Sequence, residues 1–293
     1  MTPRASHLPA VLLMLTAVAL FALMDAGLKL LAPHYPPLQV ATLRGLASLP
    51  MVLGWVLLTS TGASLLRVHW PLHLLRGALG IGMMVCFVYG LRSMPLSTAY
   101  AITFVAPMLV TAMAVPFLGE RVGPRRWTAI VVGLVGVLVV LRPTGEGVAT
   151  VAGLAVLVAA VCYAASAITV RMLAQRDSSQ AMVLWFLVLL SAGAGLLAAP
   201  DWMPLQGSDL WVIAGVGVSG SLAQVALTEA FRRGEASLIA PLEYSALLWG
   251  VGLDLALWQV LPDGVTWIGA GIIVASGLYL LRREKVHAEA EHP

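Results

Sequence analysis

Ten long apolar stretches constrain this chain more than any other feature of its sequence. A helix needs about 20 mostly apolar residues to cross the hydrocarbon core of a bilayer. Each stretch is continuously apolar, whereas the strands of a membrane barrel alternate in polarity. The stretches are Leu8–Leu31, Leu38–Leu58, Leu72–Leu91, Pro95–Leu118, Trp127–Leu141, Val151–Leu173, Met182–Ala199, Leu210–Phe231, Ala236–Trp258 and Val265–Leu281. The sequence therefore predicts an all-α integral membrane protein with ten transmembrane helices.

The composition excludes a water-soluble protein. Hydrophobic residues make up 60% of the chain and charged residues 11%, against roughly 45–50% and about 25% in soluble domains. The net charge of +3 and the absence of a long basic run give no reason to expect a nucleic-acid partner. The two cysteines, Cys86 and Cys162, lie inside apolar stretches, which argues against a disulfide framework or a metal site.

Positive residues predict the orientation of the chain, because cytoplasmic loops carry an excess of Lys and Arg. The N-terminus, alternate loops and the C-terminus contain Arg4, Arg67, Arg121, Arg125, Arg126, Arg176, Arg232, Arg233, Arg282, Arg283 and Lys285. The opposite loops contain Arg92 and Arg142 alone. Both termini are therefore expected in the cytoplasm.

The two halves of the chain resemble each other. Phe21-Ala22 and Lys29-Leu30-Leu31-Ala32 match Tyr163-Ala164 and Arg171-Met172-Leu173-Ala174 at one constant offset, and Gly77, Gly80 and Trp127 match Gly217, Gly220 and Trp267 at a slightly shorter one. Five spans per half is an odd number, so the halves must insert with opposite topology. We expect two inverted five-helix repeats, residues 1–143 and 144–284, followed by a polar, disordered cytoplasmic tail, 285–293. Inverted repeats are typical of secondary transporters, whose binding sites lie near the membrane midplane.

Several local motifs resemble the EamA branch of the drug/metabolite transporter superfamily. They are Pro95-Leu96-Ser97-Thr98-Ala99, Thr103-Phe104-Val105-Ala106-Pro107, Leu118-Gly119-Glu120-Arg121 and Ala236-Ser237-Leu238-Ile239-Ala240-Pro241-Leu242-Glu243-Tyr244. The resemblance covers nearly the whole chain. It implies ten helices, inverted halves, a bacterial inner-membrane location and export of metabolites, with the aromatic amino-acid exporters as the most similar subgroup. One departure is that the second-half counterpart of Gly119-Glu120 reads Trp258-Gln259.

Charged residues inside the spans are candidates for gating, because each costs about 2.5–3.5 kcal/mol to insert and normally faces a partner or a wet cavity. They are Asp25, Lys29, Arg44, Arg171 and Glu229. Asp25 and Lys29 share one helix face at a spacing of four, and Arg171 is the repeat equivalent of Lys29. One interpretation is a pair of mirrored ionic latches, one at each side of a central cavity. The other is static neutralisation of charge that lets helices insert and pack.

Polar and aromatic residues recur along single helix faces and predict a water-accessible, substrate-binding cavity. The predicted lining is Tyr100, Thr103, Pro107, Tyr163, Ser221, Gln224, Thr228, Pro241, Glu243, Tyr244 and Trp249. The two prolines free backbone carbonyls that can bind a ligand or act as hinges. Interhelical hydrogen bonding and simple kinks are the alternative interpretation for any one of these residues.

The sequence favours a transporter over an enzyme or a channel. Gly217-Val218-Ser219-Gly220 resembles the surroundings of a nucleophilic serine, but such a serine needs a base, and no histidine lies deep in a span. No selectivity-filter motif or charged ring is evident. We expect export of small metabolites by alternating access, with aromatic or other hydrophobic amino acids as cargo and drugs, purines or sugars as alternatives. No cofactor or metal is expected, and the partners are the substrate and the lipid bilayer. Proton coupling through Glu243 or Asp25 and facilitated diffusion both stay open, as does the oligomeric state, although one monomer suffices to form a cavity.

Overall fold

The computed structural model describes residues 8–59, 65–66, 68–119, 123–141, 151–233 and 240–291. Within these ranges the side chains of residues 126, 228, 231–233, 240–241 and 280–291 are not described. The described part of the chain contains helices, turns and loops and no β-strand. The all-α membrane fold predicted from the apolar stretches is therefore confirmed.

The helices follow the predicted spans closely. In the first half they are α1 (Leu8–Leu31), α2 (Pro37–Thr59), α4 (Trp70–Leu91), α5 (Leu96–Thr103), α6 (Ala106–Leu118) and α7 (Pro124–Leu141). In the second half they are α8 (Val151–Leu173), α9 (Ser179–Ala198), α10 (Leu210–Arg233), α12 (Ala246–Leu253) and α13 (Gly264–Glu291). Short 3-10 turns lie at Ala199–Asp201, Gly207–Asp209 and Ala240–Ser245, and a π-helical turn lies at Asp254–Trp258.

The fourth and ninth spans and the tail differ from their predicted form; the fourth, Pro95–Leu118, is divided into α5 and α6. Within the described ranges, seven helical stretches are long and apolar enough to cross a membrane, and Trp127–Leu141 and Gly264–Tyr279 are shorter apolar helices. The ninth span, predicted as one helix over Ala236–Trp258, is instead a 3-10 turn, the eight-residue helix α12 and the π-helical turn in succession. The tail predicted to be disordered continues α13 as far as Glu291, in keeping with its Ala, Glu, Lys and Arg residues, which are good helix formers.

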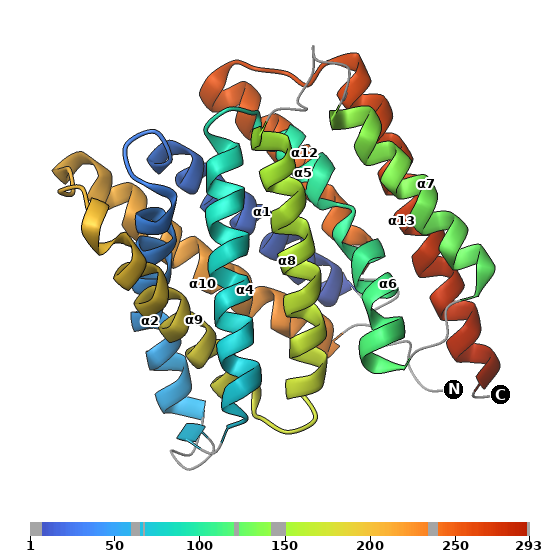
Figure 1. The fold of residues 1–293 in the computed structure, drawn as a ribbon, viewed down its shortest axis with the longest axis horizontal. Coiled ribbons are helices and arrows are strands. Elements are labelled where there is room, and N and C mark those ends of the chain that lie inside the picture. Colours follow the sequence, from blue (N-terminus) through green and yellow to red (C-terminus); the bar gives the residue numbers. More distant parts are fainter. Residues whose placement is uncertain are drawn as a thin grey trace.

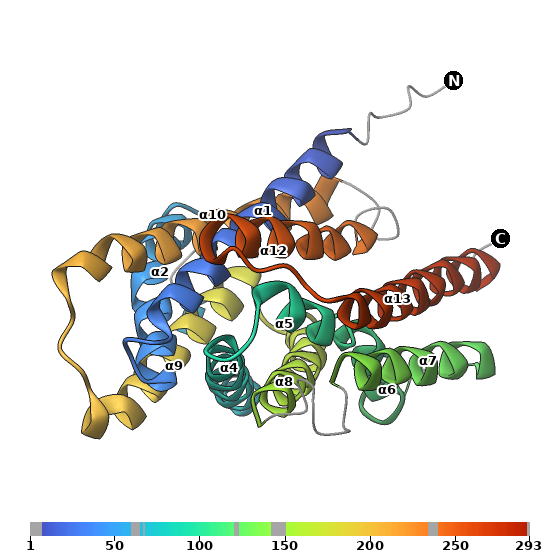
Figure 2. The same ribbon diagram turned by 90° about the horizontal axis from the view of Figure 1, so that it is seen from above.

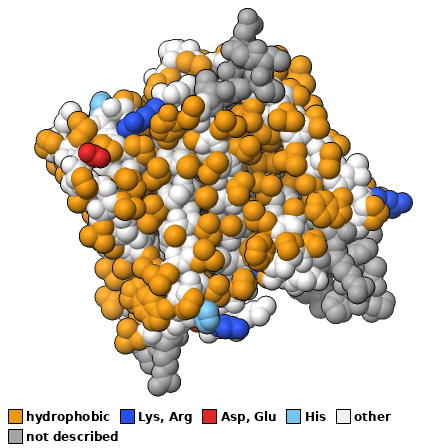
Figure 3. All heavy atoms as spheres, viewed as in Figure 1, with side chains coloured by type: hydrophobic (Ala, Val, Ile, Leu, Met, Phe, Trp, Pro, Cys, Tyr) orange, Lys and Arg blue, Asp and Glu red, His pale blue; other side chains and the backbone are white. Residues whose placement is uncertain are grey.

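The surface of the molecule is that of a protein surrounded by lipid. Large side chains such as Leu58, Trp211 and Ile268 are exposed by 88%, 84% and 61%. Figure 3 shows hydrophobic side chains over most of one face, with charged side chains at its margins. Soluble monomers rarely expose contiguous apolar patches of this extent, so this apolar face supports the membrane assignment.

The packing of the helices has the two-fold pattern of an inverted repeat. α1 packs mainly against α10, and the equivalent pair in the other half, α8 and α4, does the same. α2 packs against α9, and α7 against α13, so each of these pairs joins equivalent helices. Figures 1 and 2 both show α7 beside α13 at one edge of the molecule and α2 beside α9 at the other. The predicted architecture of two inverted five-helix repeats is thus observed.

Candidate functional site

Two interrupted helical spans meet at Phe104 and Tyr244. α5 ends at Thr103 and α6 begins at Ala106, while the second-half 3-10 turn ends at Ser245 and α12 begins at Ala246, the repeat equivalent of Ala106. Pro107 lies at the start of α6. Because proline has no N–H, the carbonyl of Thr103 lacks its usual helical donor. Discontinuous helices at equivalent positions of two inverted repeats are where transporters place their binding sites.

An aromatic and acidic cluster surrounds these breaks. The rings of Phe104 and Tyr244, which are repeat equivalents, meet edge to face with centroids 5.0 Å apart. The Glu243 carboxylate acts electrostatically on the hydroxyl groups of Tyr163 and Tyr244, and Tyr163 is 50% exposed in the middle of α8. The Tyr244 hydroxyl and the Ser245 hydroxyl are buried without a hydrogen-bond partner among the described residues. Buried hydroxyls that no described residue satisfies call for another partner, so this cluster is suited to a polar ligand.

A second network lies one helix segment away and centres on Asp254 in the π-helical turn. Lys29 on α1 contacts the Asp254 carboxylate with a 2.8 Å separation of Nζ and Oδ1. The backbone N–H groups of Leu96 and Ser97 donate to the same carboxylate at 2.9 and 2.8 Å, and the Ser97 hydroxyl donates at 2.7 Å. Lys29 also lies 4.0 Å from the ring centroid of Trp258. The carboxylate is fully buried, so these donors replace the water that it lacks.

The Asp25 carboxylate lies one helical turn before Lys29 and has a different partner. The Tyr100 hydroxyl donates to Asp25 Oδ2 at 2.8 Å. Arg44 on α2 acts electrostatically on Asp25, and its Nε contacts the sulfur of Met24 at 3.4 Å. The NH1 atom of Arg44 is buried with no hydrogen-bond partner among the described residues. Asp25 and Lys29 therefore share a helix face without pairing with each other.

The structure brings the predicted gating residues into separate environments. Asp25, Lys29 and Arg44 lie in the polar region just described, whereas Arg171 is exposed and Glu229 half-buried near the other end of the molecule. Asp254, the partner of Lys29, is not among the predicted site residues. The signal for it was an acid between Leu253 and Leu255, and the rule for charges inside apolar spans applies to it as it does to Asp25.

The predicted cavity residues divide into a central group and a peripheral group. Tyr100, Thr103, Pro107, Tyr163, Glu243 and Tyr244 lie at or beside the helix breaks. Ser221 is buried and its hydroxyl faces the Ser48 carbonyl at 3.4 Å, which is a packing contact between α10 and α2. Gln224 is half-buried on α10, and Trp249 is 46% exposed on α12. The side chains of Thr228 and Pro241 lie outside the described residues.

Each end of the molecule carries a buried carboxylate that joins two loops. We call the α1–α2 side the Tyr35 end: the Tyr35 hydroxyl and His34 Nδ1 lie 2.8 and 3.2 Å from Asp209 Oδ2. Burial and the neighbouring Asp209 carboxylate raise the pKa of Tyr35 above its usual value, so its hydroxyl stays protonated and donates. We call the α8–α9 side the Asp177 end.

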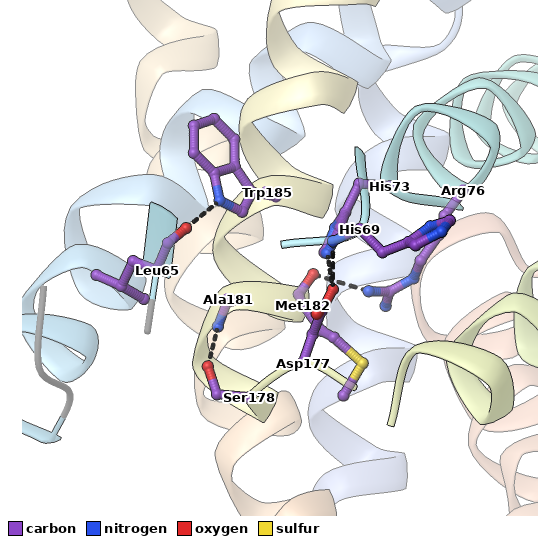
Figure 4. A network of polar contacts seen from close by, with 9 residues as sticks. All are labelled: Leu65, His69, His73, Arg76, Asp177, Ser178, Ala181, Met182 and Trp185. Carbon is purple, nitrogen blue, oxygen red and sulfur yellow. Dashed lines mark hydrogen bonds and ion pairs between the residues drawn. The ribbon is translucent and has the colours of Figure 1, made fainter. Parts of the chain in front are cut away.

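The Asp177 end repeats this arrangement with the carboxylate on the other loop. The backbone N–H of His69 and the ring Nε2 of His73 lie 3.1 and 2.9 Å from Asp177 Oδ2, as Figure 4 shows. By the offsets that relate the two halves, Asp177 is the repeat equivalent of Tyr35, and Asp209 is that of His69. Equivalent loops are therefore tied at both ends of the inverted repeat.

A shallow depression of about 320 Å³ lies elsewhere, between α7 and α13. Its lining consists of Arg125, Thr128, Ala129, Val132, Ser276 and Tyr279, and none of these is a predicted cavity residue. Among the described residues no group of three or more His, Cys, Asp or Glu side chains is placed to hold a metal ion.

Comparison with known proteins agrees with this architecture. Residues 8–142 and 150–282 each match the EamA-like transporter family. The chain is 27% identical to the pseudopaline exporter CntI of Pseudomonas aeruginosa (strain UCBPP-PA14), over 94% of this chain and 96% of the relative. It is 31% identical to a riboflavin transporter of Rhizobium johnstonii over 76% and 74% of the two chains, and 29% identical to an S-adenosylmethionine uptake transporter of Rickettsia felis over 79% of each.

One solved crystal structure has the same fold. It superposes with a TM-score of 0.67 over 93% of this chain and 96% of the other, at 21% sequence identity. The family match and the named relatives show that the protein is a multi-pass membrane transporter of small molecules rather than an enzyme. The two family matches together cover nearly the whole described chain, which belongs to the EamA-like transporter family of the drug/metabolite transporter superfamily.

Proposed function

We propose that the protein exports small amphipathic metabolites, with aromatic and other hydrophobic amino acids as its cargo, by alternating access through the central site. The observation that carries this proposal is the contact of the Phe104 and Tyr244 rings where the two interrupted spans meet, beside Glu243 and the hydroxyls of Tyr244 and Ser245, which have no hydrogen-bond partner among the described residues. Tyrosine and phenylalanine rings suit an apolar or planar group. The carboxylate and the hydroxyls suit an ammonium or another hydrogen-bond donor.

The excess of Lys and Arg in alternate loops supports an orientation with both termini in the cytoplasm, and the bacterial relatives support a location in the inner membrane. The Tyr35 end then faces away from the cytoplasm and the Asp177 end faces toward it. We take residues 1–143 and 144–284 as the two repeats that exchange roles between the inward-open and outward-open states.

The relatives widen the range of cargo to be tested. They are named for pseudopaline export, riboflavin transport and S-adenosylmethionine uptake, so this family carries several chemical classes in both directions. Drugs, purines and sugars remain alternative cargoes for this chain. Facilitated diffusion and proton coupling through Glu243 or Asp25 are both compatible with the geometry.

The test is uptake into liposomes by the purified protein. Labelled phenylalanine, tryptophan and threonine are compared with riboflavin and S-adenosylmethionine, with and without a pH gradient. We expect saturable uptake of an aromatic amino acid that unlabelled substrate competes away. We also expect a loss of at least about tenfold in Glu243→Gln, because a charge-assisted contact to the substrate is removed.

Asp201→Asn is the matched control, since Asp201 is an exposed acid in a surface turn. It should transport at the wild-type rate. Uptake of riboflavin alone would overturn the amino-acid proposal while leaving the transporter in place, and equal rates for Glu243→Gln and wild type would exclude Glu243 from the binding site.

A further inference from the structure

The turn between α4 and α5, residues 92–95, and the start of α5 are held to the rest of the Tyr35 end by three groups of polar contacts. We call this segment of the two helices and their turn the α4–α5 hairpin. Arg92 donates to the carbonyls of Ala32 and Tyr35, each at 2.6 Å. Leu96 and Ser97 donate to Asp254, and Tyr100 donates to Asp25 at 2.8 Å. All three contacts run from the hairpin to α1, to the turn after it, or to the π-helical turn.

The equivalent positions at the Asp177 end lack the side chains for two of these contacts. The repeat offsets place Ala167 opposite Asp25 and Ala240 opposite Tyr100. The residue equivalent to Asp254 is Ala114, which lies in the apolar run Met113-Ala114-Val115. Lys29, by contrast, keeps a cation at its equivalent, Arg171. The two ends of this inverted repeat therefore differ in sequence at the positions of Asp25, Tyr100 and Asp254.

The Asp254 carboxylate makes the largest number of hydrogen bonds to the hairpin, because it lies at the N-terminus of α5. It accepts the first N–H groups of α5, which are the positive end of a helix and have no partner inside that helix. The π-helical turn, a feature frequent at functional sites, brings this carboxylate to α5. Gly250 on α12 allows the approach, since an added Cβ there would lie 2.8 Å from the Tyr100 ring and 3.3 Å from Ser97 Cα. Lys29 and Trp258 hold the carboxylate from its other side.

We propose that Asp254 is a positioning residue of the transport cycle that holds the α4–α5 hairpin closed over the Tyr35 end. Opening this end requires the hairpin to leave Asp254, whereas no equivalent carboxylate restrains the Asp177 end at the matching position. The protein without substrate then rests closed at the Tyr35 end. This inference rests on alternating access as proposed above, and it identifies the residue that sets which side is closed.

The test measures the position of the hairpin directly and uses no substrate. Spin labels are placed at Ser93→Cys in the hairpin turn and Leu205→Cys in the α9–α10 loop, both exposed positions, in a background with Cys86→Ala and Cys162→Ala. Pulsed electron paramagnetic resonance in liposomes gives the distance distribution between the labels. Asp254→Asn should move the ratio of long to short distances by about tenfold toward the long ones, as expected when charge-assisted hydrogen bonds are lost.

Asp177→Asn is the matched control because it neutralises another buried carboxylate, at the opposite end (Figure 4). It should leave the distribution unchanged. If Asp254→Asn does not fold, Ser97→Ala combined with Tyr100→Phe removes the Ser97 hydroxyl donor to Asp254 and the Tyr100 donor to Asp25. This double variant should shift the ratio in the same direction by a smaller factor. A folded Asp254→Asn or double variant with the wild-type distribution overturns the proposal, and so does an equal shift in Asp177→Asn. Because transport is not measured, failure of the proposed cargo leaves this result unaffected.

Discussion

At the scale of single residues, the polar network shows how a charge is kept inside an apolar helix. Lys29 lies in a span where a bare cation costs about 2.5–3.5 kcal/mol to insert. Its ammonium has one carboxylate and one aromatic face as partners. The Asp254 carboxylate has the ammonium and three further donors. Lys29 therefore depends on Asp254 for its charged partner more than Asp254 depends on Lys29.

Because Lys29 depends more on Asp254, removing Asp254 should lower the stability of the protein more than removing Lys29. Asp254→Leu strands the Lys29 ammonium beside Trp258 and should destabilise the protein by about 3–5 kcal/mol, the usual cost of breaking a buried pair. Lys29→Met leaves Asp254 with its α5 donors and should cost less. Thermal unfolding in detergent gives both values.

The double variant Lys29→Met/Asp254→Leu is the control for this prediction. It should be more stable than Asp254→Leu alone, since no unpaired charge is left in the interior. Equal destabilisation by the two single variants, or a double variant as unstable as the sum of both, would contradict the inequality.

At the scale of elements, the fourth and ninth spans end in the same unusual backbone conformation. Gly119 after α6 has φ 70° and Gln259 after the π-helical turn has φ 55°. Both are left-handed caps, a position that glycine adopts freely and other residues adopt at a cost. The shared cap conformation makes Gln259 the structural equivalent of Gly119, whereas the sequence comparison of the two halves aligns Gly119 with Trp258. In either pairing no glutamate stands opposite Glu120.

The caps predict stability changes of opposite sign. Gly119→Ala should destabilise the protein by about 1 kcal/mol, because a Cβ is disfavoured in the left-handed region. An added Cβ there meets no atom within 4 Å, so the effect is conformational. Gln259→Gly should stabilise the protein by up to about 1 kcal/mol.

Unfolding midpoints in one detergent compare these variants with Gly271→Ala. Gly271 also has no atom within 4 Å of an added Cβ, but it lies inside α13. Alanine should be tolerated there. A loss of stability in Gly271→Ala equal to that in Gly119→Ala would show that the cap conformation is not the cause.

At the scale of the whole molecule, glycines set how closely the halves pack. An added Cβ at Gly77 on α4 would lie 2.9 Å from Leu189 Cβ, and one at Gly217 on α10 would lie 2.6 Å from Ala47 Cβ. Leu189 is the repeat equivalent of Ala47, and Gly217 is that of Gly77, so these contacts are related by the inverted repeat. Close approach of helix backbones is how membrane helices gain packing energy.

Gly217→Ala should therefore destabilise the protein by about 1–3 kcal/mol, the typical cost of overpacking. The neighbouring atoms include the Ala47 backbone, which cannot move aside as a flexible side chain can. Gly215→Ala is the matched control on the same helix, since nothing lies within 4 Å of its added Cβ, and it should cost nothing. Thermal midpoints and monodispersity in detergent check the pair, and equal effects at both positions would refute the close-packing role.

The sequence by itself determined the spans, their repeat and the membrane setting of this protein. Each spanning helix must satisfy its own backbone and bury its own apolar surface in lipid, so its position is encoded locally. The predicted limits of α1 and α8 accordingly coincide with those observed. The helix break beside Pro107 also has a local signal, because proline removes a backbone donor. The division of the ninth span, predicted as one helix over Ala236–Trp258, was not predicted.

The tertiary structure alone decided which charges meet. Asp25 and Lys29 share a helix face, yet Tyr100 binds Asp25 from 75 residues away and Asp254 binds Lys29 from 225 residues away. Helical spacing places side chains on a face and does not say which other helix lies against that face. In this protein the two-fold packing of the repeats brings the π-helical turn and the start of α5 to α1, and only that arrangement makes Asp254 the partner of Lys29.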